Sequence, residues 1–139
     1  MSDAASSIEK KDTFPKLLLH HAAVNGNAPA YRQKSLGIWQ TLTWSQAAEK
    51  AEHMALGLQS IGLNRDDKVA IIGQNTSSLY LCFAAVQAIG AIPVPLYPDS
   101  NSEELVDILK QSEIKGAICQ DQEQVDKIEK LKNEIPSIQ

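Results

Sequence analysis

The stretch from Lys68 to Asp99 has the clearest alternation of apolar and polar segments in the chain. Its first residues, KVAII, are apolar and rich in β-branched side chains, which favours a strand buried on both faces. After a polar turn at residues 73–77, apolar residues recur at helical spacing up to Gly90, a residue type that commonly ends helices. A second apolar run, Ile92–Leu96, completes about thirty residues, the length of a strand–helix–strand unit.

The helix within this unit is apolar on most of its surface, so we expect it to be buried, with Leu79, Phe83 and Val86 in the core. Uncharged residues continue from Leu79 to Tyr97, nearly the ~20 residues that span a bilayer. Gly90 and the two prolines after it break the helical pattern inside this run. The pattern therefore favours the strand–helix–strand unit over a membrane span.

The residues before Lys68 predict a helix, a hairpin and a second helix. Asp12 or Thr13 can cap a helix with Pro15 in its first turn, where the missing N–H costs nothing. Alternating segments at 30–33 and 38–42 flank a four-residue loop, 34–37, and predict a β-hairpin.

Thr43 and Gln46 have the spacing of a capping box, in which each side chain pairs with the other's backbone N–H. An apolar stripe from Trp44 to Ile61 follows and predicts an amphipathic helix on a sheet. The adjacent acids Asp66 and Asp67 precede the central strand, so we interpret them as a solvated turn and not as a metal or phosphorylation site.

The remaining chain repeats the helix–strand pattern. A helix capped by Ser100 or Ser102 should direct three apolar residues to the core, followed by a strand at 116–119 and a charged helix at 122–133. Residues 137–139 resemble the opening of another strand, which suggests a fragment of a longer protein. The expected core residues of these helices are Leu105, Ile108, Leu109, Val125, Ile128 and Leu131.

Together these elements predict an α/β fold: a parallel, doubly wound sheet with flanking helices, preceded by the N-terminal hairpin. Ligands in such sheets bind beyond the carboxyl ends of the strands, here residues 73–77, 96–102 and 119–122. The backbone amides of 73–77 could hold an anion at a helix start. A helix cap that binds nothing is the simpler interpretation of the same residues.

Composition narrows the class of protein. With 139 residues, 43% hydrophobic content and a net charge of −4, the chain is long enough for one domain and offers no basic face for nucleic acid. Cys82 and Cys119 lie far apart in apolar segments, as reduced core thiols of a cytoplasmic protein do. Residues 1–12 are polar and predict a disordered tail, not a signal peptide.

Motifs for chemistry are absent from the sequence. There is no glycine-rich phosphate loop, no serine–histidine–acid set and no HExxH. The neighbours His20 and His21 point to different faces of a helix and cannot share a metal from there. The residues alone thus predict no catalytic residue, no cofactor-binding residue and no metal ligand.

Three segments in order resemble the adenylate-forming superfamily, which comprises acyl-CoA synthetases, peptide-synthetase adenylation domains and luciferases. Residues 90–98, GAIPVPLYP, look like its second core motif, and residues 42–47, LTWSQA, look like its first, usually Leu-Thr-Tyr-x-Glu-Leu. Trp44, Gln46 and Ala47 depart from that pattern. Residues 67–72, with Asn75, are similar to the strand and turn between the two motifs. The resemblance covers roughly Phe14 to the end.

Within the superfamily, residues 95–98 followed by 102–105 are more similar to long-chain fatty acyl-CoA ligases, because the amino-acid-activating branch usually has Asp where Tyr97 stands. The resemblance implies that residues 13–139 are an incomplete AMP-binding domain, its N-terminal or first subdomain. It implies ATP, Mg²⁺ and coenzyme A as cofactors of the full-length enzyme, a fatty acid as substrate, and the missing catalytic half as partner.

The superfamily's chemistry has two halves: a carboxylate and ATP give an acyl-adenylate and pyrophosphate, and coenzyme A then displaces AMP. Its Ser/Thr/Gly-rich loop, adenine-binding aromatic stretch, ribose-binding Asp and C-terminal lysine match nothing here, so no catalytic residue is carried over. The full-length form is expected in the cytoplasm, with a peripheral contact to the membrane left open.

A stand-alone, flavodoxin-like binding or regulatory module without catalysis is the alternative. It would need a ligand loop at 73–77 or 96–102. A fragment, in contrast, should expose an apolar face and an unpaired sheet edge. We expect it to form a homodimer or to aggregate, either through the sheet end that includes Ile138 or through loop residues near Tyr97.

Overall fold

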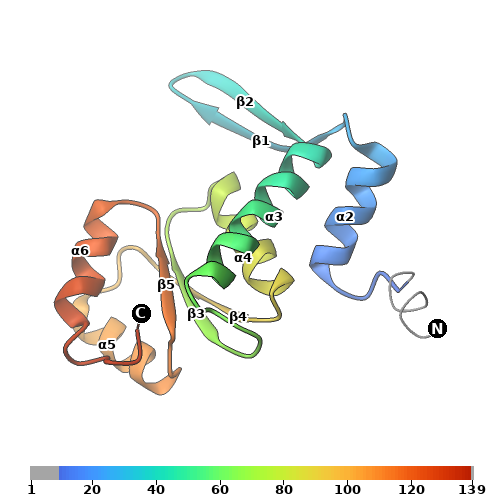
Figure 1. The fold of residues 1–139 in the computed structure, drawn as a ribbon. Helices are drawn as coiled ribbons and strands as arrows, with labels where there is room; N and C mark the ends of the chain where they lie inside the picture. Colours follow the sequence, from blue (N-terminus) through green and yellow to red (C-terminus); the bar gives the residue numbers. More distant parts are fainter. Residues whose placement is uncertain (1–9, 139) are drawn as a thin grey trace, which may run out of the picture.

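The computed structural model describes residues 10–138 (Figure 1). Most of the predicted disordered tail, residues 1–9, lies outside the described residues, and so does Gln139. In chain order the elements are α2 (Phe14–Asn25), β1 (Pro29–Ser35), β2 (Ile38–Thr43), α3 (Trp44–Ser60), β3 (Lys68–Ile72), α4 (Ser77–Ala88), β4 (Ile92–Leu96), α5 (Ser102–Gln111), β5 (Gly116–Cys119) and α6 (Gln122–Leu131).

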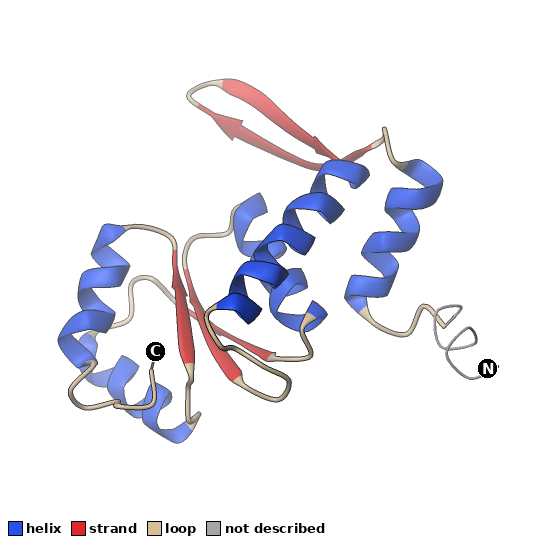
Figure 2. Cartoon of the chain, viewed as in Figure 1, coloured by secondary structure: helices blue, strands red, loops and turns tan. Residues whose placement is uncertain are grey.

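A three-stranded parallel sheet in the order β4-β3-β5 forms the centre of the fold. Alternate residues of β3 serve two cores, because successive side chains of a strand point to opposite faces. Val69 and Ile71 pack toward α3 and α4, whereas Ala70 and Ile72 pack toward α5 and α6. Figure 2 shows these helix pairs on opposite faces of the sheet, which confirms the doubly wound α/β prediction.

Helix α4 is buried on two sides, against the sheet and against its neighbouring helices. Cys82 and Val86 contact the sheet-side core, while Leu81 joins the cluster that α3 forms with α2. The prediction that Leu79, Phe83 and Val86 are core residues is therefore right in full only for Val86, which is 0% exposed. The other two are half-buried, since the sheet and the neighbouring helices cover two different sides of this helix.

The N-terminal elements follow the predicted order. Thr13 caps α2, with proline in the first turn, and Thr43 with Gln46 forms the predicted capping box at the start of α3. Strands β1 and β2 pair as an antiparallel hairpin that projects away from the parallel sheet (Figure 1). Its loop is only Leu36 and Gly37, because pairing extends two residues further than the predicted four-residue loop allows.

Two predictions, one about α3 and one about α5, need correction. The apolar stripe of α3 buries four alanines, but Ile61 is 65% exposed, since it is the C-cap and lies beyond the last residue of the helix. Helix α5 is capped by Asn101 and not by Ser100 or Ser102; the Asn101 side chain accepts a hydrogen bond from the backbone of Glu104.

The end of the chain also differs from the prediction. Ile108 is 39% exposed while Leu105 and Leu109 are fully buried, so the buried stripe of α5 is narrower than predicted. Val125 of α6 is likewise 37% exposed, and α6 ends at Leu131. Residues 137 and 138 form no strand, and Ile138 is buried in the core with α5 and α6. In residues 10–138, no helix has the length and apolar character to cross a membrane.

Candidate functional site

The carboxyl ends of β3 and β5 border a cleft of about 310 Å³, at the edge where the sequence predicts ligand loops. Residues from β3, β5, α4 and the hairpin form its walls. This edge is where open α/β sheets bind ligands. The lining includes Gln33, Gly73, Thr76, Cys82, Cys119 and Gln120.

Several backbone amides at this edge already have partners within the protein. The Gln33 side-chain oxygen accepts from the N–H of Ser77 at 3.0 Å, and the Thr76 hydroxyl accepts from Leu79 at 3.4 Å. The Gln120 side-chain oxygen accepts from the N–H of Gln74. These amides would have to lose their partners before they could bind phosphate, so the structure favours a capped helix start over an anion site.

Sequence reasoning missed Gln33, and it placed Gln120 in the predicted 119–122 loop without its bond to Gln74. Gln33 lies 44 residues before Ser77, and Gln120 lies 46 residues after Gln74. Capping signals are read within three or four positions, so a cap supplied from a distant strand leaves no local pattern. Gly73 packs so closely under Gln120 that a Cβ there would lie 2.8 Å from the Gln120 oxygen.

The two thiols that line the cleft are poor nucleophiles. Burial raises the pKa of Cys82, and burial together with the nearby Asp121 raises the pKa of Cys119. Reactive cysteines need the opposite shift, because the thiolate is the attacking form. Both cysteines are free; Cys82 is buried, as predicted for a core thiol, whereas Cys119 is only half-buried.

The loop at 96–102 is organised by structural contacts. Asn101 caps α5, and the Lys127 ammonium donates to the Pro98 carbonyl at 2.6 Å. Tyr97 projects from this loop and is 83% exposed. Lys127 therefore ties the loop to α6, and Tyr97 is one of its exposed side chains, with Asp99 and Asn101.

A second cavity, of about 480 Å³, lies between α2, α3, α4 and β1 and is mostly apolar. His21 stacks on Trp44 with ring centroids 4.6 Å apart, and Tyr31 stacks on Tyr80 at 6.2 Å. Burial raises the pKa of Tyr31. These stacked rings explain the packing of α2 and the hairpin onto α3 and α4.

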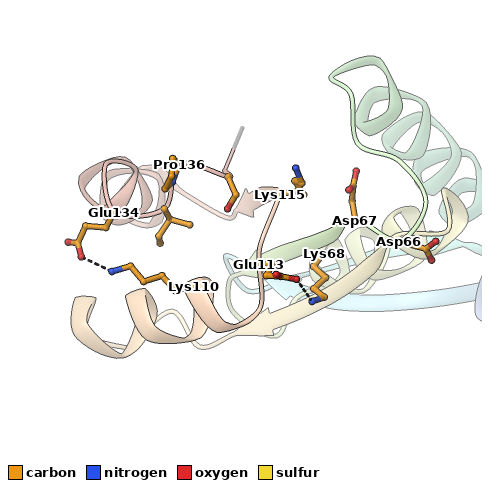
Figure 3. Close-up of a pocket in the computed structure, with 10 residues that line it drawn as sticks. Asp66, Asp67, Lys68, Lys110, Glu113, Lys115, Glu134 and Pro136 are labelled. Carbon is orange, nitrogen blue, oxygen red and sulfur yellow. Dashed lines mark hydrogen bonds and ion pairs between the residues drawn. The ribbon is translucent and has the colours of Figure 1, made fainter.

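A third cavity, of about 520 Å³, opens at the opposite, amino-terminal edge of the sheet (Figure 3). Four of its charged side chains form two ion pairs: Lys68 with Glu113 at 3.5 Å, and Lys110 with Glu134 at 3.2 Å. The Asp67 carboxylate accepts from the backbone of Asn64 within the polar turn. These partly exposed pairs are ordinary surface ion pairs.

Among residues 10–138, no three His, Cys, Asp or Glu side chains gather as metal ligands would. The structure thus brings together the predicted loops at 73–77 and 119–122 in one cleft, while the 96–102 loop lines none of the three cavities above. None of these three cavities combines an activated nucleophile or general base with a built phosphate-binding site.

Comparison with known proteins identifies the family of this chain. A family model described as AMP-binding enzyme matches residues 18–139. The long-chain-fatty-acid–CoA ligase FadD15 of Mycobacterium bovis is 24% identical over 135 residues, which make up 97% of this chain and 22% of that protein. The chain therefore spans about a fifth of the length of this curated relative.

A shorter relative and a solved structure extend the comparison. Protein Rv1549 of Mycobacterium tuberculosis is 27% identical over 123 residues, 88% of this chain and 69% of that protein. A solved chain from Rhodopseudomonas palustris, assigned as a long-chain-fatty-acid CoA ligase, matches with a TM-score of 0.79 and 25% identity. The match covers 91% of this chain and 31% of that chain.

Proposed function

This chain belongs to the AMP-binding enzyme family, and from that premise we propose that it forms the N-terminal segment of a long-chain fatty acid–CoA ligase. The observation that carries the proposal is the family match from residue 18 to residue 139, joined by a ligase relative that aligns over 97% of the chain. The order β4-β3-β5 with helices on both faces is consistent with it.

In the whole enzyme, a fatty acid and ATP would give an acyl-adenylate and pyrophosphate, and the coenzyme A thiol would then displace AMP. The described residues do not fit ATP or Mg²⁺. The amides of Gln74 and Ser77 are paired with side chains, and no metal-ligand group forms among residues 10–138. We therefore assign no step of the reaction to this segment.

Its proposed role is structural: residues 13–139 act as an N-terminal subdomain that supplies sheet and helices to the part of the enzyme that binds ATP, Mg²⁺ and coenzyme A. The partner is that remainder of the same enzyme. A cytoplasmic location is part of the proposal, supported by the two free cysteines.

An activity assay tests this function. We expect no pyrophosphate from the 139-residue chain with ATP, Mg²⁺, palmitate and coenzyme A. The longer polypeptide, which contains these 139 residues and whatever the reading frame encodes after codon 139, should release pyrophosphate and form palmitoyl-CoA. Turnover by the 139-residue chain alone would contradict the structural role.

The reading frame itself supplies a second test. A Ser/Thr/Gly-rich loop ending in Pro-Lys downstream of residue 139 would support the ligase. A stop codon there would favour a short protein comparable to Rv1549, of which this chain covers 69%.

A further inference from the structure

The turn of the hairpin carries a group of exposed apolar side chains. Figure 1 shows β1 and β2 extending beyond the helices, with the turn at their outer end. Leu36 in this turn is 100% exposed, Ile38 is 65% exposed and Trp39 is 57% exposed. Single exposed apolar side chains are ordinary, but three within four residues of a projecting turn form a candidate contact site. We call these three residues the apolar tip.

Leu36 occupies the turn against the preference of its backbone. Its φ is +48°, in the left-handed region where leucine is disfavoured and where the tight turn of a hairpin favours asparagine. Its side chain is fully exposed, so packing within the chain does not offset this strain. Strained residues cluster at sites of function. An apolar side chain at residue 36 therefore indicates a contact outside the folded chain.

Basic residues stand behind the apolar tip, and no acidic residue accompanies them. Residues 29–43 contain Arg32 and Lys34 but no Asp or Glu, in a chain whose net charge is −4. Lys34 pairs with Trp39 across the hairpin, and the Arg32 guanidinium lies 5.2 Å from the centroid of the Trp39 ring. The three side chains therefore share one face. The hairpin complements an anionic surface, whereas the chain as a whole does not.

The geometry of the hairpin fits a medium that surrounds the apolar tip. Ile38 and Trp39 are successive strand residues and face opposite sides of the hairpin. A flat protein surface would cover only one of them, whereas lipid can contact both. At about 3.3 Å per residue, Lys34 lies about 7 Å and Arg32 about 13 Å along the strand from Leu36. When apolar side chains insert by about 5–10 Å, these positions fall at the lipid phosphates and just outside them.

We propose that the hairpin docks on an anionic lipid bilayer, with the apolar tip inserted at the interface and the two basic residues against the lipid phosphates. Insertion is shallow, because the two-stranded sheet has unpaired outer edges among the described residues, and hydrocarbon does not tolerate unpaired backbone groups. A second copy that paired along β1 fits less well, since Arg32 and Lys34 would meet their own positive charges about a two-fold axis. This inference goes beyond the proposed function and does not depend on it.

The test is binding of the 139-residue chain to lipid vesicles, measured by co-sedimentation. Vesicles of phosphatidylcholine with about one third phosphatidylglycerol should bind the chain at least about tenfold more tightly than phosphatidylcholine alone, because each basic residue near an anionic surface adds to the attraction. Higher salt should weaken this binding, since it screens charges at the lipid surface. Equal binding to both kinds of vesicle, or binding to neither, would refute the proposal.

Two substitutions separate the apolar tip from the rest of the surface. Leu36→Asn should weaken binding to the anionic vesicles at least about fivefold, because it removes an inserted apolar side chain, while asparagine suits the positive φ of the turn. Ile38→Asn should act in the same way. Ile61→Asn is the matched control, because Ile61 is also 65% exposed but lies at the end of α3 that is far from the hairpin. Full binding by Leu36→Asn, or an equal loss in Ile61→Asn, would overturn the proposal.

The basic residues are tested by a pair of double variants. Arg32→Gln/Lys34→Gln should weaken binding to anionic vesicles about tenfold or more and leave the weaker binding to phosphatidylcholine unchanged. Lys115→Gln/Lys130→Gln removes the same charge from two exposed residues, one directly before β5 and one in α6, and should have little effect. Equal losses in the two double variants would mean that net charge attracts the chain to the membrane, and would refute the hairpin site.

Trp39 reports its own insertion. On anionic vesicles its emission should shift to shorter wavelength as the indole leaves water, and lipids that carry bromine on their acyl chains should quench it. Trp39→Phe should lose both changes, because Trp44, the other tryptophan of the chain, stacks on His21 within the fold. A bound wild-type chain without quenching would refute insertion. A chain that binds no vesicle but forms a dimer that Leu36→Asn dissociates would overturn the proposal in favour of a second copy.

Discussion

The side-chain oxygen of Gln33 accepts two hydrogen bonds from Ser77, one from the backbone N–H and one from the hydroxyl, both at 3.0 Å. Gln33 belongs to the hairpin and Ser77 is the first residue of α4, so the contact joins two elements that are 44 residues apart. It holds the hairpin over the helix start and satisfies one of the N–H groups that every helix leaves unpaired.

We predict that Gln33→Ala lowers the free energy of unfolding by about 1–2 kcal/mol, because a part-buried N–H and a hydroxyl lose their acceptor. Urea denaturation followed by circular dichroism measures the change. Gln40→Ala is the matched control: Gln40 is the cross-strand partner of Gln33 but is exposed. Equal losses in the two variants would show that strand propensity, and not the cap, is responsible.

The fold was largely predictable because its signals are local. The capping box at Thr43 and Gln46, the buried run at β3 and the glycine after α4 each lie within a few residues of the feature they specify. The cleft was not predictable in detail, because Gln33 and Gln120 reach it from distant segments.

The prediction of an exposed sheet edge at Ile138 is wrong, and the reason again lies in contacts between residues that are distant in the sequence. Ile138 is buried among residues of α5 and α6, which reach it through tertiary contacts that no sequence period encodes. Among the described residues, the end strands of the parallel sheet are β4 and β5. Self-association of the isolated chain remains a prediction, and Tyr97 remains accessible.

Two neighbouring residues of α5 should respond very differently to truncation. Leu109 is 0% exposed, whereas Ile108 is 39% exposed. Leu109→Ala should cost about 2–5 kcal/mol of unfolding free energy, because it leaves a cavity in the core. Ile108→Ala should cost less than about 1 kcal/mol, since it removes little buried area. Denaturant midpoints give both values, and similar losses would show that the helix is rotated from its described orientation.

The thiols of Cys82, which is buried, and Cys119, which is half-buried, should make the protein less stable at alkaline pH. Burial raises the pKa of Cys82 and Cys119 above the ordinary value of 9.0, so the unfolded chain loses these protons first as the pH rises. Their contribution is therefore complete below about pH 9 and declines above it. Unfolding free energies at pH 7–10 should fall less steeply in a Cys82→Ala/Cys119→Ala chain. Parallel pH profiles in the two chains would rule out this linkage.

The hairpin loop offers a stabilising substitution. Leu36 has φ of +48° and Gly37 has φ of +82°, the two positive angles of the tight turn that favours Asn-Gly. A leucine in this left-handed conformation costs roughly 1–2 kcal/mol, because its Cβ approaches the following carbonyl. Leu36 is 100% exposed, so no packing is lost when it is replaced. Leu36→Asn should raise the unfolding free energy by about 1 kcal/mol.

Gly37→Ala is the opposite test of the same turn. A Cβ at residue 37 would meet no atom within 4 Å, so any loss of stability must come from the backbone angle and not from a clash. We expect the alanine variant to lose about 1 kcal/mol, because alanine disfavours positive φ. Thermal unfolding of the two variants beside the wild type gives both signs in one experiment. A destabilised Leu36→Asn chain would mean that the loop adopts another turn in solution, with negative φ at residue 36.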